Sequence, residues 1–158
     1  MEWLEHLIRN ASDHIDSGLL HHDVVDTVTM GKTRLPLHVI QLGSSSPDVP
    51  AVGYFGGVHG VERIGTEVVI TFLQSLIDRL RWDADLQHFL SRIRLVFMPL
   101  VNPVGMLRKT RSNGNHVDLM RNAPVDAIKR PPFLLGGQRI TRHLCLLYTS
   151  DAADDLFR

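Results

Sequence analysis

The chain has 158 residues, of which 44% are apolar and 22% are charged, a composition ordinary for a globular domain. Its 17 basic and 17 acidic residues balance, which argues against nucleic acid or an anionic membrane as the main partner. No apolar run reaches the length of a membrane span, the first residues do not resemble a secretory signal, and the single cysteine cannot form an internal disulfide. We therefore expect no membrane partner and a cytoplasmic location.

Four segments are rich in the β-branched and apolar residues of strands. They are residues 24–30, 35–42, 49–55 and 93–98. Gly31-Lys32-Thr33 separates the first two as a turn, and a Gly- and Ser-rich loop follows the second. The third segment is short and apolar throughout, which is typical of a buried strand.

Three segments have apolar residues at helical spacing. They are residues 2–17, 65–81 and 84–90. The second gives the strongest signal, because its apolar residues form one continuous stripe. Strands that alternate with helices favour an α/β fold, here an incomplete mixed sheet flanked by helices.

The third strand leads into Gly56-Gly57-Val58-His59-Gly60-Val61-Glu62, where the chain changes from strand to helix. An imidazole and a carboxylate are both good zinc ligands, and the glycines allow a turn tight enough to bring them together. His59 and Glu62 are therefore candidate metal ligands. The alternative is a histidine near the surface and a glutamate in the first turn of a helix, where the helix dipole favours a carboxylate.

Cationic and amide side chains are concentrated in residues 108–122, directly after the fourth strand and the turn Asn102-Pro103-Val104-Gly105. In open α/β sheets ligands collect beyond the carboxyl ends of strands. A guanidinium at such a place can hold a carboxylate in a two-pronged bond, or stabilise negative charge on a carbonyl oxygen. The alternative is a basic loop in water.

Four pieces of the sequence resemble, in the same order, the motifs of the zinc carboxypeptidases of the carboxypeptidase A type. The first is similar to the His-x-x-Glu zinc motif and the second to an Asn-Pro-Asp-Gly turn. The third and fourth resemble an arginine-containing substrate segment and an Asp-x-Asn-Arg-Asn segment. In this chain they are His59–Glu62, Asn102–Gly105, Arg108–Ser112 and Asp118–Asn122.

The resemblance implies a metallocarboxypeptidase that uses one Zn²⁺ ion and hydrolyses C-terminal peptide bonds. It assigns His59 and Glu62 to the metal, Arg108 to the scissile carbonyl, and Arg121 to the carboxylate of a peptide or small amide substrate. Met120 stands where the family has an asparagine that assists carboxylate binding, and a thioether cannot donate a hydrogen bond. The family's third ligand, a histidine, and its catalytic glutamate have no counterpart here, so we expect the chain itself to be inactive.

Two other functions share these motifs. The layout also resembles the related zinc deacylases of N-acylamino acids, such as aspartoacylase and succinylglutamate desuccinylase. A chain with two ligands and no identified base could also be a non-catalytic fragment that binds carboxylates.

The last residues differ in character from the rest. From Cys145 to Asp155 the sequence reads as the translation of a common sequencing adapter. We therefore expect residues 1–144 to be the N-terminal part of a zinc carboxypeptidase-like catalytic domain and residues 145–158 to be an artefactual tail.

Overall fold

A computed structural model of the chain describes Leu7 and residues 18–120. These residues fall into two compact units. The first, which we call the sheet unit, contains Leu7 and residues 18–57 and 63–101; the second, the loop unit, contains residues 58–62 and 102–120. The expected helix over residues 2–17 lies outside the described residues except for Leu7, which is helical and buried. The expected artefactual tail lies outside them entirely.

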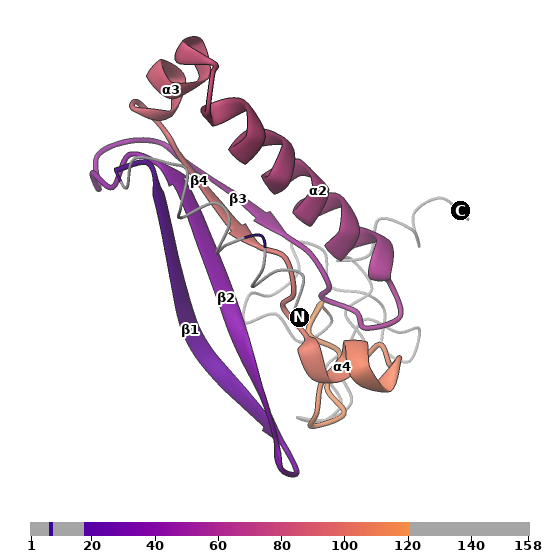
Figure 1. Cartoon of the computed structure of the whole chain (residues 1–158). Coiled ribbons are helices and arrows are strands. Elements are labelled where there is room, and N and C mark those ends of the chain that lie inside the picture. The colour runs from indigo at the N-terminus through magenta and orange to yellow at the C-terminus, as the bar shows by residue number, and fades with distance from the viewer. Residues whose placement is uncertain (1–6, 8–17, 121–158) are drawn as a thin grey trace, which may run out of the picture. The chain divides into compact units, whose positions relative to one another are not determined.

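The sheet unit is built on four strands. They are β1 (Leu20–Met30), β2 (Thr33–Gly43), β3 (Ala51–Phe55) and β4 (Arg94–Met98). Their order across the sheet is β1-β2-β4-β3 (Figure 1). The pairs β1–β2 and β2–β4 are antiparallel, and the pair β4–β3 is parallel. The predicted mixed sheet is therefore confirmed. Gly31 makes the tight β1–β2 turn with φ of 59°, a conformation that favours glycine.

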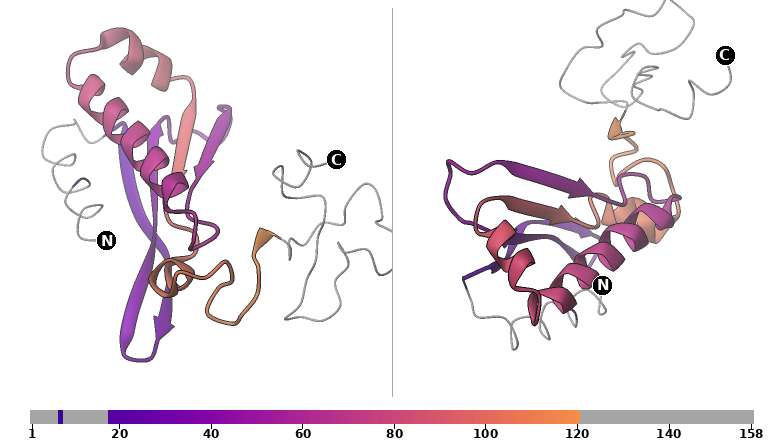
Figure 2. Two further views of the ribbon diagram at one scale, coloured as in Figure 1. Left: turned by 90° about the vertical axis from the view of Figure 1, so that its right-hand side faces the viewer. Right: turned by 90° about the horizontal axis from the view of Figure 1, so that it is seen from above.

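Two helices of the sheet unit follow the predicted periodicity. Helix α2 (Arg63–Leu80) runs along one face of the sheet, and α3 (Ala84–Leu90) follows it (Figures 1 and 2). Asp83 caps α3, because its carboxylate accepts the backbone N–H of Leu86 at 2.9 Å. No helix among the described residues is long and apolar enough to cross a membrane.

The core of the sheet unit lies between α2 and the sheet. Apolar residues of α2 meet the residues of β2 and β4 that face the helix. Three aromatic rings close one side of this core: Tyr54 stacks on Phe97 at a centroid distance of 5.0 Å and meets the edge of Phe72 at 5.1 Å. Such aromatic pairs add to the stability that burial of their area provides.

Two local predictions need correction. The third strand was expected to be buried, but most of β3 is exposed, because the strand order places it at the edge of the described sheet. The segment Asn102–Gly105, expected to be a turn, begins the short helix α4 (Pro103–Arg108) of the loop unit. Its turn-forming residues act as a cap, since Asn102 accepts the N–H of Gly105 and proline suits the first helical position.

Two phenylalanines allow a direct test of where the core lies. Phe97 is completely buried, whereas Phe89 on α3 is largely exposed. We expect Phe97→Ala to lower the free energy of unfolding by about 3–5 kcal/mol, because it leaves a cavity in a packed core. The matched substitution Phe89→Ala should lower the free energy of unfolding by less than about 1 kcal/mol. Urea unfolding followed by circular dichroism measures both, and equal losses would contradict this position of the core.

Candidate functional site

The backbone of residues 58–62 is fixed by other parts of the loop unit. Asn102 is buried, and its Nδ2 donates to the carbonyl of Val58 at 3.1 Å. The N–H of Gly60 donates to the carbonyl of Thr110 at 3.0 Å. A Cβ atom on Gly60 would overlap the backbone carbonyl of Gly105, so only glycine permits this close approach. These contacts place the His59 turn against the start of α4 and the segment that follows it.

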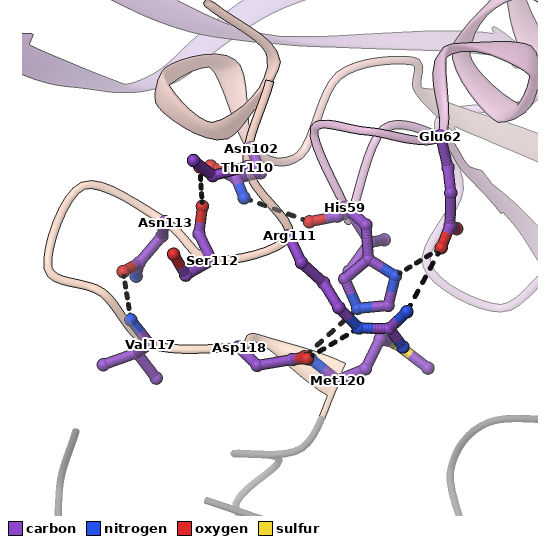
Figure 3. A network of polar contacts seen from close by, with 11 residues as sticks. His59, Glu62, Asn102, Thr110, Arg111, Ser112, Asn113, Val117, Asp118 and Met120 are labelled. Atoms are coloured by element: carbon purple, nitrogen blue, oxygen red, sulfur yellow. Dashed lines mark hydrogen bonds and ion pairs between the residues drawn. The ribbon is translucent and has the colours of Figure 1, made fainter. Parts of the chain in front are cut away.

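His59 lies between two carboxylates (Figure 3). Its Nδ1 is 3.1 Å from Oε1 of Glu62, and its Nε2 is 3.1 Å from Oδ1 of Asp118. The histidine is only 5% exposed. The Glu62 side chain, by contrast, is 54% exposed, so the Glu62 side of the ring is the side open to solvent.

Arg111 links the two carboxylates. Its Nε donates to Oδ2 of Asp118 at 2.9 Å, and its Nη1 lies 3.6 Å from Oε1 of Glu62 (Figure 3). The guanidinium therefore offsets part of the negative charge beside the imidazole. A charge-assisted bond to Asp118 also holds that carboxylate in place for its contact with His59.

The two carboxylates set a requirement on the His59 ring. A neutral imidazole has one N–H and can donate to only one of them. If that proton is on Nε2 and bonded to Asp118, the lone pair of Nδ1 points toward the oxygen of Glu62. The second contact is then favourable only if a proton or a metal cation lies between Nδ1 and Glu62.

A zinc ion fits this requirement. Two ligands of a tetrahedral zinc with bonds of about 2.0–2.2 Å lie roughly 3.3–3.6 Å apart, slightly farther than the 3.1 Å between His59 Nδ1 and Glu62 Oε1. Metal-binding histidines commonly donate their other N–H to a carboxylate, which fixes the tautomer. The carboxylate of Asp118 is placed in this way, next to Nε2 of His59. Within the part of the chain that the structure describes, no third histidine, cysteine or carboxylate converges to complete a metal site.

The other predicted site residues lie at or beyond the edge of what the structure describes. Arg108 is the last residue of α4, and its side chain is exposed. Arg121 lies outside the described residues. Met120 is exposed, and its backbone N–H donates to Oδ1 of Asp118 at 3.1 Å. Met120 therefore contributes to the site through its main chain.

Sequence reasoning missed two residues of this cluster, Asp118 and Arg111. Both lie inside the motifs Arg108–Ser112 and Asp118–Asn122, but neither was predicted to have a role. Asn113 is one of the amide side chains in the polar segment 108–122, which was expected to bind a ligand. In the structure the Asn113 side chain accepts the N–H groups of Asn115 and Val117, at 2.9 and 3.0 Å, and so shapes the loop that carries Asp118.

Comparison with known proteins identifies similar sequences. The sequence pattern of the family described as zinc carboxypeptidase matches residues 17–133. The chain is 34% identical to Carboxypeptidase SOL1 of Arabidopsis thaliana over 92 residues, which are 56% of this chain and 19% of that protein. It is 29% identical to Carboxypeptidase M of Mus musculus over 85 residues, which are 48% of this chain and 19% of that protein.

Solved structures show a similar fold. A metallo-carboxypeptidase from Burkholderia cenocepacia matches with a TM-score of 0.55 at 18% identity, covering 76% of this chain and 31% of that one. A metallo-carboxypeptidase from Pseudomonas aeruginosa, in complex with (2-guanidinoethylmercapto)succinic acid, matches with a TM-score of 0.52 at 22% identity, covering 76% and 30%. The chain thus spans about a fifth of the length of these sequence relatives and less than a third of these solved structures.

The close contact between the backbones of Gly60 and Gly105 can be tested by comparing two glycine-to-alanine substitutions. Gly60→Ala should lower the free energy of unfolding by roughly 3 kcal/mol or more, because backbone must move to admit the methyl group. Gly114→Ala should have little effect, since a Cβ there meets only the Val104 side chain at 3.4 Å. Thermal unfolding gives the stabilities, and amide NMR shifts of Gly105 and Met106 report the local displacement. An unperturbed Gly60→Ala protein would contradict the described contact.

Proposed function

Since this chain belongs to the zinc carboxypeptidase family, as the four motifs led us to expect, we propose that it is part of a zinc-dependent metallocarboxypeptidase that hydrolyses C-terminal peptide bonds. The observation that carries the proposal is the position of His59, with one ring nitrogen toward Glu62 and the other toward Asp118. The family match supports the class of enzyme. The contacts of His59 support the assignment of His59 and Glu62 as zinc ligands.

His59 and Glu62 would hold the zinc ion, through Nδ1 and the carboxylate. Asp118 would keep the proton of the imidazole on Nε2, so that the lone pair of Nδ1 remains available. Zinc, when bound, supplies a Lewis acid that polarises a carbonyl and activates water. The described residues supply neither a third ligand nor a general base, so both would come from outside them.

The substrate roles fall to two arginines. Arg108 would stabilise negative charge that develops on the oxygen of the scissile carbonyl. Arg121 would bind the free carboxylate of a peptide or small amide substrate through two parallel hydrogen bonds. The exposed position of Arg108 at the end of α4 leaves its guanidinium accessible to a substrate. Met120 cannot donate a side-chain hydrogen bond, so Arg121 would act without the amide partner usual in the family.

Zinc binding by the 158-residue chain tests the ligand assignment. Two ligands should bind zinc far more weakly than the roughly 10–16 kcal/mol of structural zinc sites. We expect Glu62→Gln to weaken the affinity at least about tenfold further, whereas Glu67→Gln, an exposed change on α2, should leave it unchanged. Isothermal titration calorimetry measures both. Equal effects of the two changes, or tight stoichiometric zinc in the unaltered chain, would contradict the assignment.

Activity must be tested on a longer protein that contains this sequence. We expect it to cleave a peptide with a free C-terminus and to spare the same peptide ending in an amide. Arg108→Ala should lower kcat by about 10²–10³-fold, and Arg121→Ala should mainly raise KM. Arg81→Ala, at an exposed position following α2, serves as the control. Activity on N-acylamino acids but not on peptides would instead assign the protein to the deacylases.

A further inference from the structure

The cluster around His59 contains two carboxylates, and these do not by themselves select zinc. Carboxylate oxygens are the side-chain ligands that Ca²⁺, Mg²⁺ and Mn²⁺ prefer, whereas an imidazole nitrogen suits zinc and similar transition metals. Glu62 and Asp118 each lie 3.1 Å from a nitrogen of the His59 ring. Their negative charges attract cations of both kinds, so a preference for zinc requires a further group that acts on the carboxylates.

Both oxygens of Asp118 are already engaged by protein groups. Oδ2 accepts the Nε–H of Arg111 at 2.9 Å. Oδ1 lies 3.1 Å from Nε2 of His59 and accepts the backbone N–H of Met120, also at 3.1 Å. The side chain of Asp118 is only 15% exposed. A metal ion that needs this carboxylate would therefore have to break a charge-assisted hydrogen bond to the guanidinium.

The guanidinium of Arg111 also reaches the second carboxylate. Its Nη1 lies 3.6 Å from Oε1 of Glu62, the oxygen that faces Nδ1 of His59 (Figure 3). One planar cation thus lies between oxygens of both carboxylates. A metal ion that binds through carboxylates would take this place, because there it is nearest to both negative charges. A guanidinium stays protonated at physiological pH, so the place is filled by a permanent positive charge.

The imidazole of His59 gives zinc a ligand that does not require Asp118 to change its contacts. Under the proposed function the metal takes Nδ1 of His59 and the carboxylate of Glu62. Asp118 then keeps its contact with Nε2 of His59 and its hydrogen bond to Arg111. Zinc binding therefore leaves the pair of Arg111 and Asp118 intact, whereas binding of a metal through both carboxylates must disrupt it.

We propose that Arg111 determines which metal this site accepts. Its guanidinium excludes Ca²⁺, Mg²⁺ and Mn²⁺ from the place between Glu62 and Asp118, and so favours a metal that binds the imidazole. This inference rests on the proposed function for the identity of the zinc ligands, and it adds a residue that selects the metal. Because the exclusion depends on charge, another cationic side chain of similar length should preserve it and an uncharged one should not.

The affinities of the 158-residue chain for zinc and for Mn²⁺ test the proposal. Arg111→Met removes the charge and should lower the preference for zinc over Mn²⁺ at least about tenfold, mainly by strengthening Mn²⁺ binding, because both carboxylates become available. Isothermal titration calorimetry measures zinc, and the electron paramagnetic resonance signal of free Mn²⁺ measures Mn²⁺, at one pH and ionic strength. Lys109→Met removes an exposed positive charge from the same segment and should leave the preference unchanged.

A third variant, Arg111→Lys, separates selection by charge from support of the fold. Lysine keeps the positive charge but lacks the planar fork, so Mn²⁺ binding should stay as weak as in the unaltered chain. Weaker zinc binding in both Arg111 variants with no gain of Mn²⁺ in either would overturn the proposal, and so would an equal gain of Mn²⁺ in both. The gain of Mn²⁺ can be measured even in a chain that binds no zinc, so a failure of the zinc-ligand assignment is distinguishable from a failure of metal selection.

Discussion

The site depends on one constraint: the imidazole of His59 has two nitrogens, and each faces a carboxylate. Asp118 restrains the ring from the buried side, and Glu62 meets it from the exposed side. Because neutral imidazole carries a single proton, one of these contacts must involve a further proton or a cation. The more exposed contact, with Glu62, is where an ion from solvent can enter. The contact of the His59 ring with Glu62 thus depends on a third residue, far along the chain, that holds the ring.

The loop unit achieves this placement through two side-chain amides that bond to the main chain and through one close backbone contact. Asn102 bonds to Val58 on one side and caps α4 on the other, so one buried amide joins the turn to the helix. Gly60 lets two backbones meet without an intervening side chain. Asn113 then shapes the loop that returns Asp118 to His59. These two side-chain amides bond to main-chain groups, and so they fix the paths of the two segments that bring His59 and Asp118 together.

The sequence predicted those features that depend on neighbouring residues. Helices α2 and α3 and strands β1, β2 and β4 follow from local periodicity and turn chemistry. The exposure of β3 could not be predicted in this way, because it depends on strand order, and the same apolar residues suit a central strand or an unprotected edge. The bond between His59 and Asp118 joins residues 59 positions apart, and no local pattern encodes it. The motif resemblance named both segments without showing which atoms meet.

Arg111 distributes the charge of this cluster unevenly between its two carboxylates. With a neutral imidazole, Glu62 and Asp118 carry two negative charges and Arg111 supplies one positive charge, so one negative charge is left over. The guanidinium binds Asp118 closely, at 2.9 Å, but lies 3.6 Å from Glu62. The uncompensated charge therefore resides mainly on Glu62, next to Nδ1 of His59. A divalent cation placed there, as the proposed function requires, would be attracted by Glu62 and repelled by Arg111, so the guanidinium would weaken the attraction that Glu62 alone exerts.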